Sequence, residues 1–452
     1  MGCNFFELSR KDIKYYLFLT VYVVIIYYLM MTAYSETFRQ SYYGLLFVYS
    51  FNAAKCVLAI GETIIIFWLT VKKTGADSLS EKIMFLLNLL YFIPGTIQQA
   101  VTDADIKYML FFFLFWMGME AWLMILKPNN ISFIPKEHVH LKRDTYLLVI
   151  TVFAFVIIEY IAIHYGQVFS VSNIKATLGD VYGVRAASKE AGMHWILVCL
   201  EYFSVYFLIL MITYYTEKRN WIIVGLCGIA EISAFLVQAN RIIPFLAALA
   251  FVMGLIKVDN KMLCFAFAVL AVILVVEVKI DIHGLSFTNV YRRYSIVPNR
   301  LSEQYFDFFR THTPDFLRSK YTRFSGWLGM KSEYLSPSIG MTIGRVYYDA
   351  DANCNTGLVG GGAFMFGLAA PVITTFGYCM AYRIFELASS GMKDTRVVNC
   401  MALVLATLSI NTGTMLANIF SISYIMLLCL SLVFAGALSG NMDAAGRVAS
   451  NG

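Results

Sequence analysis

Charged residues are scarce in this chain of 452 residues, where Asp, Glu, Lys and Arg together make up 14%. Soluble domains carry about 25% charged residues. Apolar side chains take their place at 59%, and the mean hydropathy is +0.67. Apolar runs of about 18 residues or more, which are long enough to cross a bilayer, recur along the whole length. These features exclude a soluble globular protein and predict an all-α polytopic membrane protein.

Cysteine and proline patterns exclude two further classes. The nine cysteines are an odd number and contain no CxxC pair, so neither a disulfide framework nor a zinc site is predicted. Only Cys354 falls in a long predicted outer loop. The eight prolines form no Pro-rich linker, and no tandem repeat is visible. We therefore predict a single membrane domain over residues 1–452, elaborated in its loops.

The apolar runs predict roughly twelve transmembrane helices. Lys and Arg concentrate in alternate short loops, which places those loops and both termini in the cytoplasm. Two long loops, 167–193 and 281–356, are then predicted outside, and the larger one is expected to be partly helical. The predicted spans lie near 13–34, 43–71, 83–101, 106–126, 145–166, 194–216, 220–239, 242–256, 262–280, 357–385, 397–414 and 415–438.

Several charged residues fall within or beside these spans, where each charge is costly to insert. Lys55 and Glu62 are seven residues apart and share one helix face. For most of the set we expect pairing between helices, although those near span ends could instead reach the interface. The residues are Lys55, Glu62, Glu120, Glu159, Glu201, Glu231 and Arg241.

The predicted outer segments prefer arginine to lysine. Segment 281–356 holds seven arginines and two lysines. Solubility alone would not favour arginine, whereas the planar guanidinium binds phosphate through two hydrogen bonds. Arg241 lies in the tight turn "VQANRIIPF". The alternative to a phosphate ligand there is an arginine that anchors the turn at the membrane interface. The candidate phosphate ligands are Arg185, Arg241, Arg292, Arg293 and Arg300.

The stretch "VYRRYSIVPNRLSEQYFDFF" (290–309) predicts an amphipathic helix that begins near Pro298. Its apolar residues, at i, i+4, i+7 and i+8, form one face. With that face outside the bilayer, the helix either lies on the membrane or caps the transmembrane helices. The face consists of Leu301, Tyr305, Phe308 and Phe309.

The stretch "YDADANCNTGLVGGGAFMFG" (348–367) passes from acids and amides directly into a glycine-rich apolar run. The polar side chains are candidates for hydrogen bonding to a ligand, and Asn-x-Asn favours a turn. The alternative is a capped helix start followed by small-residue packing. Asp349 and Asp351 have DxD spacing, which by itself does not predict a metal. The polar candidates are Asp349, Asp351, Asn353 and Asn355.

These two stretches, with Arg185 and Arg241 at predicted outer helix ends, resemble the Wzy-type polymerases of O-antigen and capsule repeat units. Members of that family often carry an Arg-rich stretch ending in Pro, an aromatic helix and an "NANTG" turn before a glycine-containing span. This chain has Cys354 where that turn has Ala. The paired loop motifs described for some members are not found in this sequence, so the resemblance implies no role for such motifs here.

The resemblance implies a GT-C-like fold in a bacterial cytoplasmic (inner) membrane, with the active site facing the periplasm. Donor and acceptor would be undecaprenyl-diphosphate-linked oligosaccharides. The sugar end of the acceptor would attack the anomeric carbon, and arginines would stabilise the departing diphosphate without a metal or other cofactor. The implied partners are the bilayer and a chain-length regulator, with no nucleic acid. A lipid-linked glycan ligase and a transporter or flippase remain alternatives.

Residue roles follow from the same resemblance. The acceptor hydroxyl also needs a base, and the sequence does not choose among His194, His283, His312, Glu303, Asp307, Asp349 and Asp351. The catalytic candidates are Arg241, Arg292, Arg293, His312 and Asp307. The substrate-binding candidates are Arg185, Arg300, Tyr305, Asp349, Asp351, Asn353 and Asn355.

Overall fold

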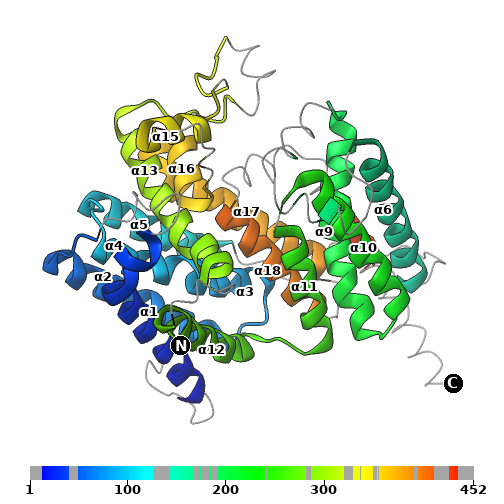
Figure 1. Cartoon of the computed structure of the whole chain (residues 1–452), viewed down its shortest axis with the longest axis horizontal. Helices are drawn as coiled ribbons and strands as arrows, with labels where there is room; N and C mark the ends of the chain where they lie inside the picture. Colours follow the sequence, from blue (N-terminus) through cyan, green and yellow to red (C-terminus); the bar gives the residue numbers. More distant parts are fainter. Residues whose placement is uncertain are drawn as a thin grey trace. The chain divides into compact units, whose positions relative to one another are not determined.

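The regular elements described in the computed structural model are all helices (Figure 1). The structure describes residues 13–39, 49–126, 143–165, 173–174, 177, 184, 192–240, 242–280, 287–319, 329–335, 337–349, 354, 356–390, 395–411 and 427–435. The helices are α1 (Ile13–Arg39), α2 (Ala53–Lys72), α3 (Leu79–Leu87), η3 (Asn88–Phe92), α4 (Ile93–Val101), α5 (Ile106–Ile125), α6 (Arg143–Tyr165), α9 (Trp195–Glu217), α10 (Trp221–Gln238), α11 (Ile242–Leu255), α12 (Asn260–Lys279), η4 (Phe287–Ile296), α13 (Val297–Thr311), α15 (Ile339–Tyr348), α16 (Leu358–Phe366), α17 (Ala370–Ser389) and α18 (Thr395–Asn411).

Within the described residues, nine helical segments are long and apolar enough to cross a membrane, and two shorter apolar helices accompany them. The chain is therefore a multi-pass membrane protein, as its composition predicted. Eleven of the predicted spans each overlap one of these helices. The twelfth, 415–438, lies mostly outside the described residues, so the count of twelve stays a prediction.

Two predicted span boundaries were wrong. The second span begins at Ala53 rather than near 43, because the Asn52 side chain accepts hydrogen bonds from the backbone N–H groups of Ala54 and Lys55 and caps the helix. The predicted span 357–385 is broken. Helix α16 ends at Phe366. The next residue, Gly367, has a φ of 55°, in the left-handed region, and α17 begins at Ala370 after a short 3-10 turn.

The chain divides into two compact units. Unit 1 holds residues 1–127, 259–381 and 405–420, and unit 2 holds 128–258, 382–404 and 421–452. In unit 2, α6, α9, α10 and α11 pack as neighbours. There, Asp144 accepts hydrogen bonds from Tyr214 Oη at 2.5 Å and Lys218 Nζ at 2.6 Å, which ties the start of α6 to the end of α9.

The segment α3–η3–α4 forms the centre of unit 1. Its apolar window is wholly buried, and α1, α2, α5 and η4 pack against α4. Polar contacts fix this segment because unpaired polar groups are costly in an apolar interior. Tyr22 Oη donates to Leu89 O at 2.6 Å, and Trp116 Nε1 donates to Asn88 Oδ1 at 3.0 Å. The segment therefore links helices that are distant in sequence.

The expected pairing of intramembrane charges is confirmed for part of the set. Lys73 Nζ lies 2.8 Å from Glu120 Oε2, and both side chains are mostly buried. Lys55 Nζ instead donates to two backbone carbonyls. Among the described residues, the buried carboxylates of Glu62 and Glu231 have no hydrogen-bond partner. Charge pairing thus explains some of these residues and not others.

Lys73→Met is expected to lower the free energy of unfolding by up to about 3–5 kcal/mol, because it leaves the Glu120 carboxylate buried without its partner. The double variant Lys73→Met/Glu120→Met is expected to recover most of that loss, since an apolar pair needs no compensation. Thermal melts of purified protein in detergent measure both. Additive losses in the double variant would show that the two side chains are not coupled.

Candidate functional site

Helix α13 confirms the amphipathic helix predicted for 290–309. It begins at Val297, with Pro298 in its first turn, where the missing N–H of proline is not needed. The four predicted apolar residues, Leu301, Tyr305, Phe308 and Phe309, are all buried. In unit 1 the helix packs against α15, α16 and α5, as the neighbouring ribbons of α13, α15 and α16 in Figure 1 also show. It therefore caps other helices through its apolar face.

The two stretches that carry the family resemblance lie against each other. Tyr305 Oη donates to Cys354 O at 2.9 Å, and Thr356 Oγ1 donates to Pro298 O at 3.1 Å. The approach is close at Gly360 of α16, where an added Cβ would lie 3.0 Å from Ser302 Cα. The two stretches, whose contacting residues are 49 and 58 positions apart in sequence, thus pack against each other. Glycine in the second stretch permits the close approach.

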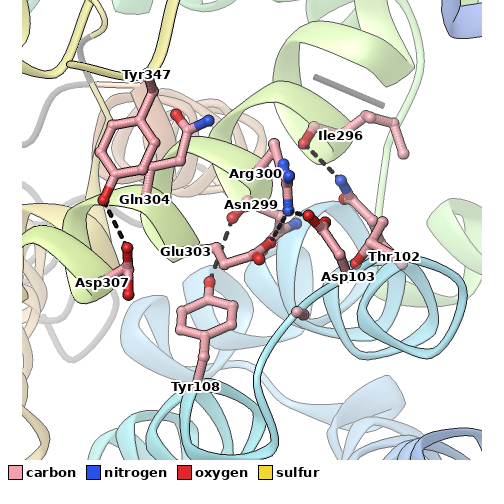
Figure 2. Close-up of polar contacts among 12 residues, drawn as sticks. Thr102, Asp103, Tyr108, Ile296, Asn299, Arg300, Glu303, Gln304, Asp307 and Tyr347 are labelled. Carbon is pink, nitrogen blue, oxygen red and sulfur yellow. Dashed lines mark hydrogen bonds and ion pairs between the residues drawn. The ribbon is translucent and has the colours of Figure 1, made fainter. Parts of the chain in front are cut away.

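The polar face of α13 carries a chain of ion pairs, and Figure 2 shows those of Arg300. Arg300 Nη1 lies 2.6 Å from Glu303 Oε2, one turn along α13, and 2.8 Å from Asp103 Oδ1 in the turn between α4 and α5. Arg310 repeats the pattern less tightly, with Nη1 at 3.0 Å from Asp105 Oδ2 and Nη2 at 3.3 Å from Asp307 Oδ1. Each arginine therefore bridges one carboxylate of α13 and one of the turn.

Helix α15 extends this polar face. Tyr347 Oη donates to Asp307 Oδ2 at 2.8 Å, as Figure 2 shows, and Tyr348 Oη donates to Gln304 Oε1 at 2.8 Å. Asp307 is exposed, and both tyrosines are half-buried. Phenol, amide and carboxylate groups that lie side by side suit the recognition of a ligand with many hydroxyl groups, because each can donate to or accept from a hydroxyl.

Backbone contacts hold the turn at 102–105 beside α13. Lys55 Nζ, at the start of α2, donates to Thr102 O at 2.5 Å and to Ala104 O at 3.2 Å. Tyr108 Oη donates to Asn299 O at 3.3 Å. Asp105 also caps α5 by accepting from Lys107 N at 3.1 Å. Hydrogen bonds to the turn and to the start of α5 thus hold Asp103 and Asp105 beside α13.

Burial and charge act on Arg300 and Glu303 in opposite directions. Burial lowers the pKa of Arg300, but the carboxylates of Glu303 and Asp103 more than offset it and leave that pKa above its ordinary value. Burial also raises the pKa of Glu303, although Arg300 opposes the shift. The negative charge of Asp103 adds to the increase, so the pKa of Glu303 stays above its ordinary value. Glu303 is thus a carboxylate that accepts a proton more readily than usual.

The structure places the other predicted residues as follows. Arg292 and Arg293 lie on η4, which leads into α13, and are half-buried and exposed respectively. The His312 ring stacks on Phe308, with ring centroids 3.9 Å apart, just beyond the end of α13. Asp349 ends α15 with a left-handed φ of 48° and is exposed. Arg185, Arg241, Asp351, Asn353 and Asn355 lie outside the described residues, as does His283.

Sequence reasoning missed Asp103, Asp105 and Lys55 as members of this site. The acids of "TDADIK" served only as evidence of orientation, and Lys55 only as an intramembrane charge. A signal was available, since paired acids in an otherwise short outer turn complement an Arg-rich outer segment. In the described residues, no group of three or more His, Cys, Asp or Glu side chains could hold a metal ion.

Comparison with known proteins returned no matching family model, no matching curated protein and no matching solved structure.

Proposed function

We propose that the chain is a membrane glycosyltransferase that uses a lipid diphosphate as leaving group. Its particular reaction would be the polymerisation of oligosaccharide repeat units carried on undecaprenyl diphosphate. The observation that supports this is the packing of 290–309 against the segment around Cys354 and α16, the two stretches that resemble repeat-unit polymerases. That packing carries an arginine–carboxylate network on the opposite face of α13.

In this proposal a bond forms between an acceptor hydroxyl oxygen and the anomeric carbon of the donor. The bond from that carbon to the diphosphate oxygen breaks, and the hydroxyl proton passes to a base. Glu303 is our candidate base, because burial raises its pKa and thus strengthens it as a proton acceptor. Arg300, Arg292 and Arg293 would bind the diphosphate and stabilise its growing charge.

The remaining residues would position the sugars. Asp307 with Tyr347, and Gln304 with Tyr348, offer paired donors and acceptors for hydroxyl groups. His312, just beyond the end of α13, would be an alternative base. The Tyr305 hydroxyl donates to Cys354 O, so we assign Tyr305 to holding the two segments together. The polymerase would have a GT-C-like fold in a bacterial inner membrane, with this face toward the periplasm and a chain-length regulator as partner.

The break between α16 and α17 favours a second candidate function. A helix interrupted within an apolar span is typical of transporters, whose substrates bind at such breaks. In this chain the break at Gly367 interrupts the candidate span Leu358–Ser389. A transporter or flippase for the same lipid-linked oligosaccharide would move its substrate without forming a glycosidic bond.

The test is an incubation of the purified protein in detergent with lipid-diphosphate-linked repeat units in the presence of a chelator. We expect a ladder of products spaced by one repeat unit, because arginines replace the metal as the stabiliser of the diphosphate. Substrate whose terminal acceptor hydroxyl is blocked is the control and should give no ladder. A folded protein that gives no ladder from its own organism's repeat unit would overturn the proposal, and flipping of that lipid in vesicles would support the transporter.

A further inference from the structure

We propose that the turn at 102–105 is an exchangeable latch on this site. Asp103 and Asp105 hold Arg300 and Arg310 in this structure, and a diphosphate group would take both arginines from them. The inference rests on the proposed function for the chemical class of its ligand. It adds a step of regulation, because the arginines become available only when the turn releases them.

The first argument is the geometry of Arg300. Both of its carboxylate partners contact Nη1, and Figure 2 shows the guanidinium between them. Its Nε–H group is buried and has no acceptor among the described residues. Nε and Nη2 form the side edge of a guanidinium, which binds two oxygens of one phosphate. The pairing with Asp103 and Glu303 thus leaves the Nε–H group of Arg300 without an acceptor, on the edge that an oxyanion prefers. Water does not easily compensate for this, because Arg300 is only 9% exposed.

The second argument is the unequal strength of the contacts. Glu303 is largely buried, with 15% of its side chain exposed, whereas the Asp103 side chain is 53% exposed. Arg310 and Asp105 are 39% and 50% exposed. Exposed ion pairs are weak because water competes with them. The two contacts to the turn are therefore weaker than the Arg300–Glu303 pair, and a multiply charged anion can displace them while that pair persists.

The third argument is the local charge. Within this network three cations interact with four carboxylates, so its formal charge is negative. The cations are Lys55, Arg300 and Arg310, and the carboxylates are those of Asp103, Asp105, Glu303 and Asp307. A diphosphate would be repelled from it. Withdrawal of the two aspartates leaves three cations against two carboxylates, and the site becomes positive. Release of the two aspartate side chains therefore makes this part of the site favourable to an anion.

Inorganic pyrophosphate is the probe for the first experiment, titrated into the full-length protein in detergent by calorimetry. Asp103→Asn is expected to tighten binding about tenfold, because it removes a competing charge but keeps the shape. Arg300→Gln is expected to weaken binding by about tenfold or more, because it removes the phosphate ligand. Asp105→Asn should also tighten binding, and asparagine keeps the cap of α5.

Asp259→Asn is the matched control, since Asp259 caps α12 by accepting from Met262 N at 2.8 Å and is likewise an exposed aspartate. It loses the same charge, and its affinity for pyrophosphate should not change. Hydrogen exchange gives a second readout. Amides in 102–106 should exchange faster when pyrophosphate is added to the unaltered protein, because the turn loses its contacts to α13.

An unchanged or weaker affinity in Asp103→Asn, or exchange at 102–106 that stays constant or slows, would overturn the latch. So would a lack of any pyrophosphate binding. Farnesyl diphosphate, tested in parallel, distinguishes a lipid-linked diphosphate from a free one. If the latch exists, Asp103→Asn increases the affinity for whichever of the two ligands binds. A product ladder with no effect of Asp103→Asn would leave the polymerase standing without the latch. Tighter binding of the diphosphate by Asp103→Asn with no product ladder would support the latch and contradict the polymerase.

Discussion

Arg300→Lys is expected to slow formation of the product ladder by at least about a hundredfold, which is the usual cost of losing one donor to a developing oxyanion. Lysine keeps the positive charge, so it can still pair with Asp103 and Glu303 and support folding. It lacks the planar fork, and therefore cannot hold two phosphate oxygens in fixed geometry. Initial rates of ladder formation, with protein level and melting temperature checked in parallel, measure the effect.

The control for this prediction is Arg345→Lys. Arg345 is exposed, lies on α15 and has no part in the proposed binding of the diphosphate. The same substitution there should leave the rate close to that of the unaltered protein. If Arg300→Lys retains the full rate, the guanidinium of Arg300 does not contact the leaving group, and the role of phosphate ligand passes to Arg292 and Arg293.

Gly118→Ala is expected to lower the free energy of unfolding by about 1–3 kcal/mol or more. The added Cβ would lie 2.9 Å from Thr375 Oγ1 and closer still to the carbonyl oxygen of Pro371. Because the nearest atom belongs to the backbone of α17, it cannot rotate away. Either α5 and α17 must separate in unit 1, or the protein does not fold. Melting temperature and yield in detergent measure the outcome.

Gly61→Ala is the matched control, since it makes the same change within α2. An added Cβ at Gly61 meets nothing within 4 Å. Alanine is favoured over glycine inside a helix by about 0.5–1 kcal/mol, so this variant should be as stable as the unaltered protein or slightly more so. Equal effects of the two substitutions would show that α5 and α17 do not approach as closely as the structure has them.

Helix α13 shows how far the sequence could predict the candidate site. The apolar face of Leu301, Tyr305 and Phe308 is a local pattern. It predicted the helix, but it left open whether that face lies on the membrane or caps other helices. The partners of its polar face were not predictable. Asp103 is nearly 200 residues before Arg300 in the sequence, and local patterns carry no information about which distant acid a given arginine will meet.

The sequence by itself determined that this is a multi-pass helical membrane protein, where most of its helices lie and that α13 is amphipathic. These features depend on composition and on the spacing of neighbouring residues, because a bilayer requires each spanning helix to be apolar along its own length. Only the tertiary structure decided that Arg300 is shared between Asp103 and Glu303, and that the Cys354 segment backs onto α13. Those contacts depend on how helices pack, and packing is a property of the whole chain.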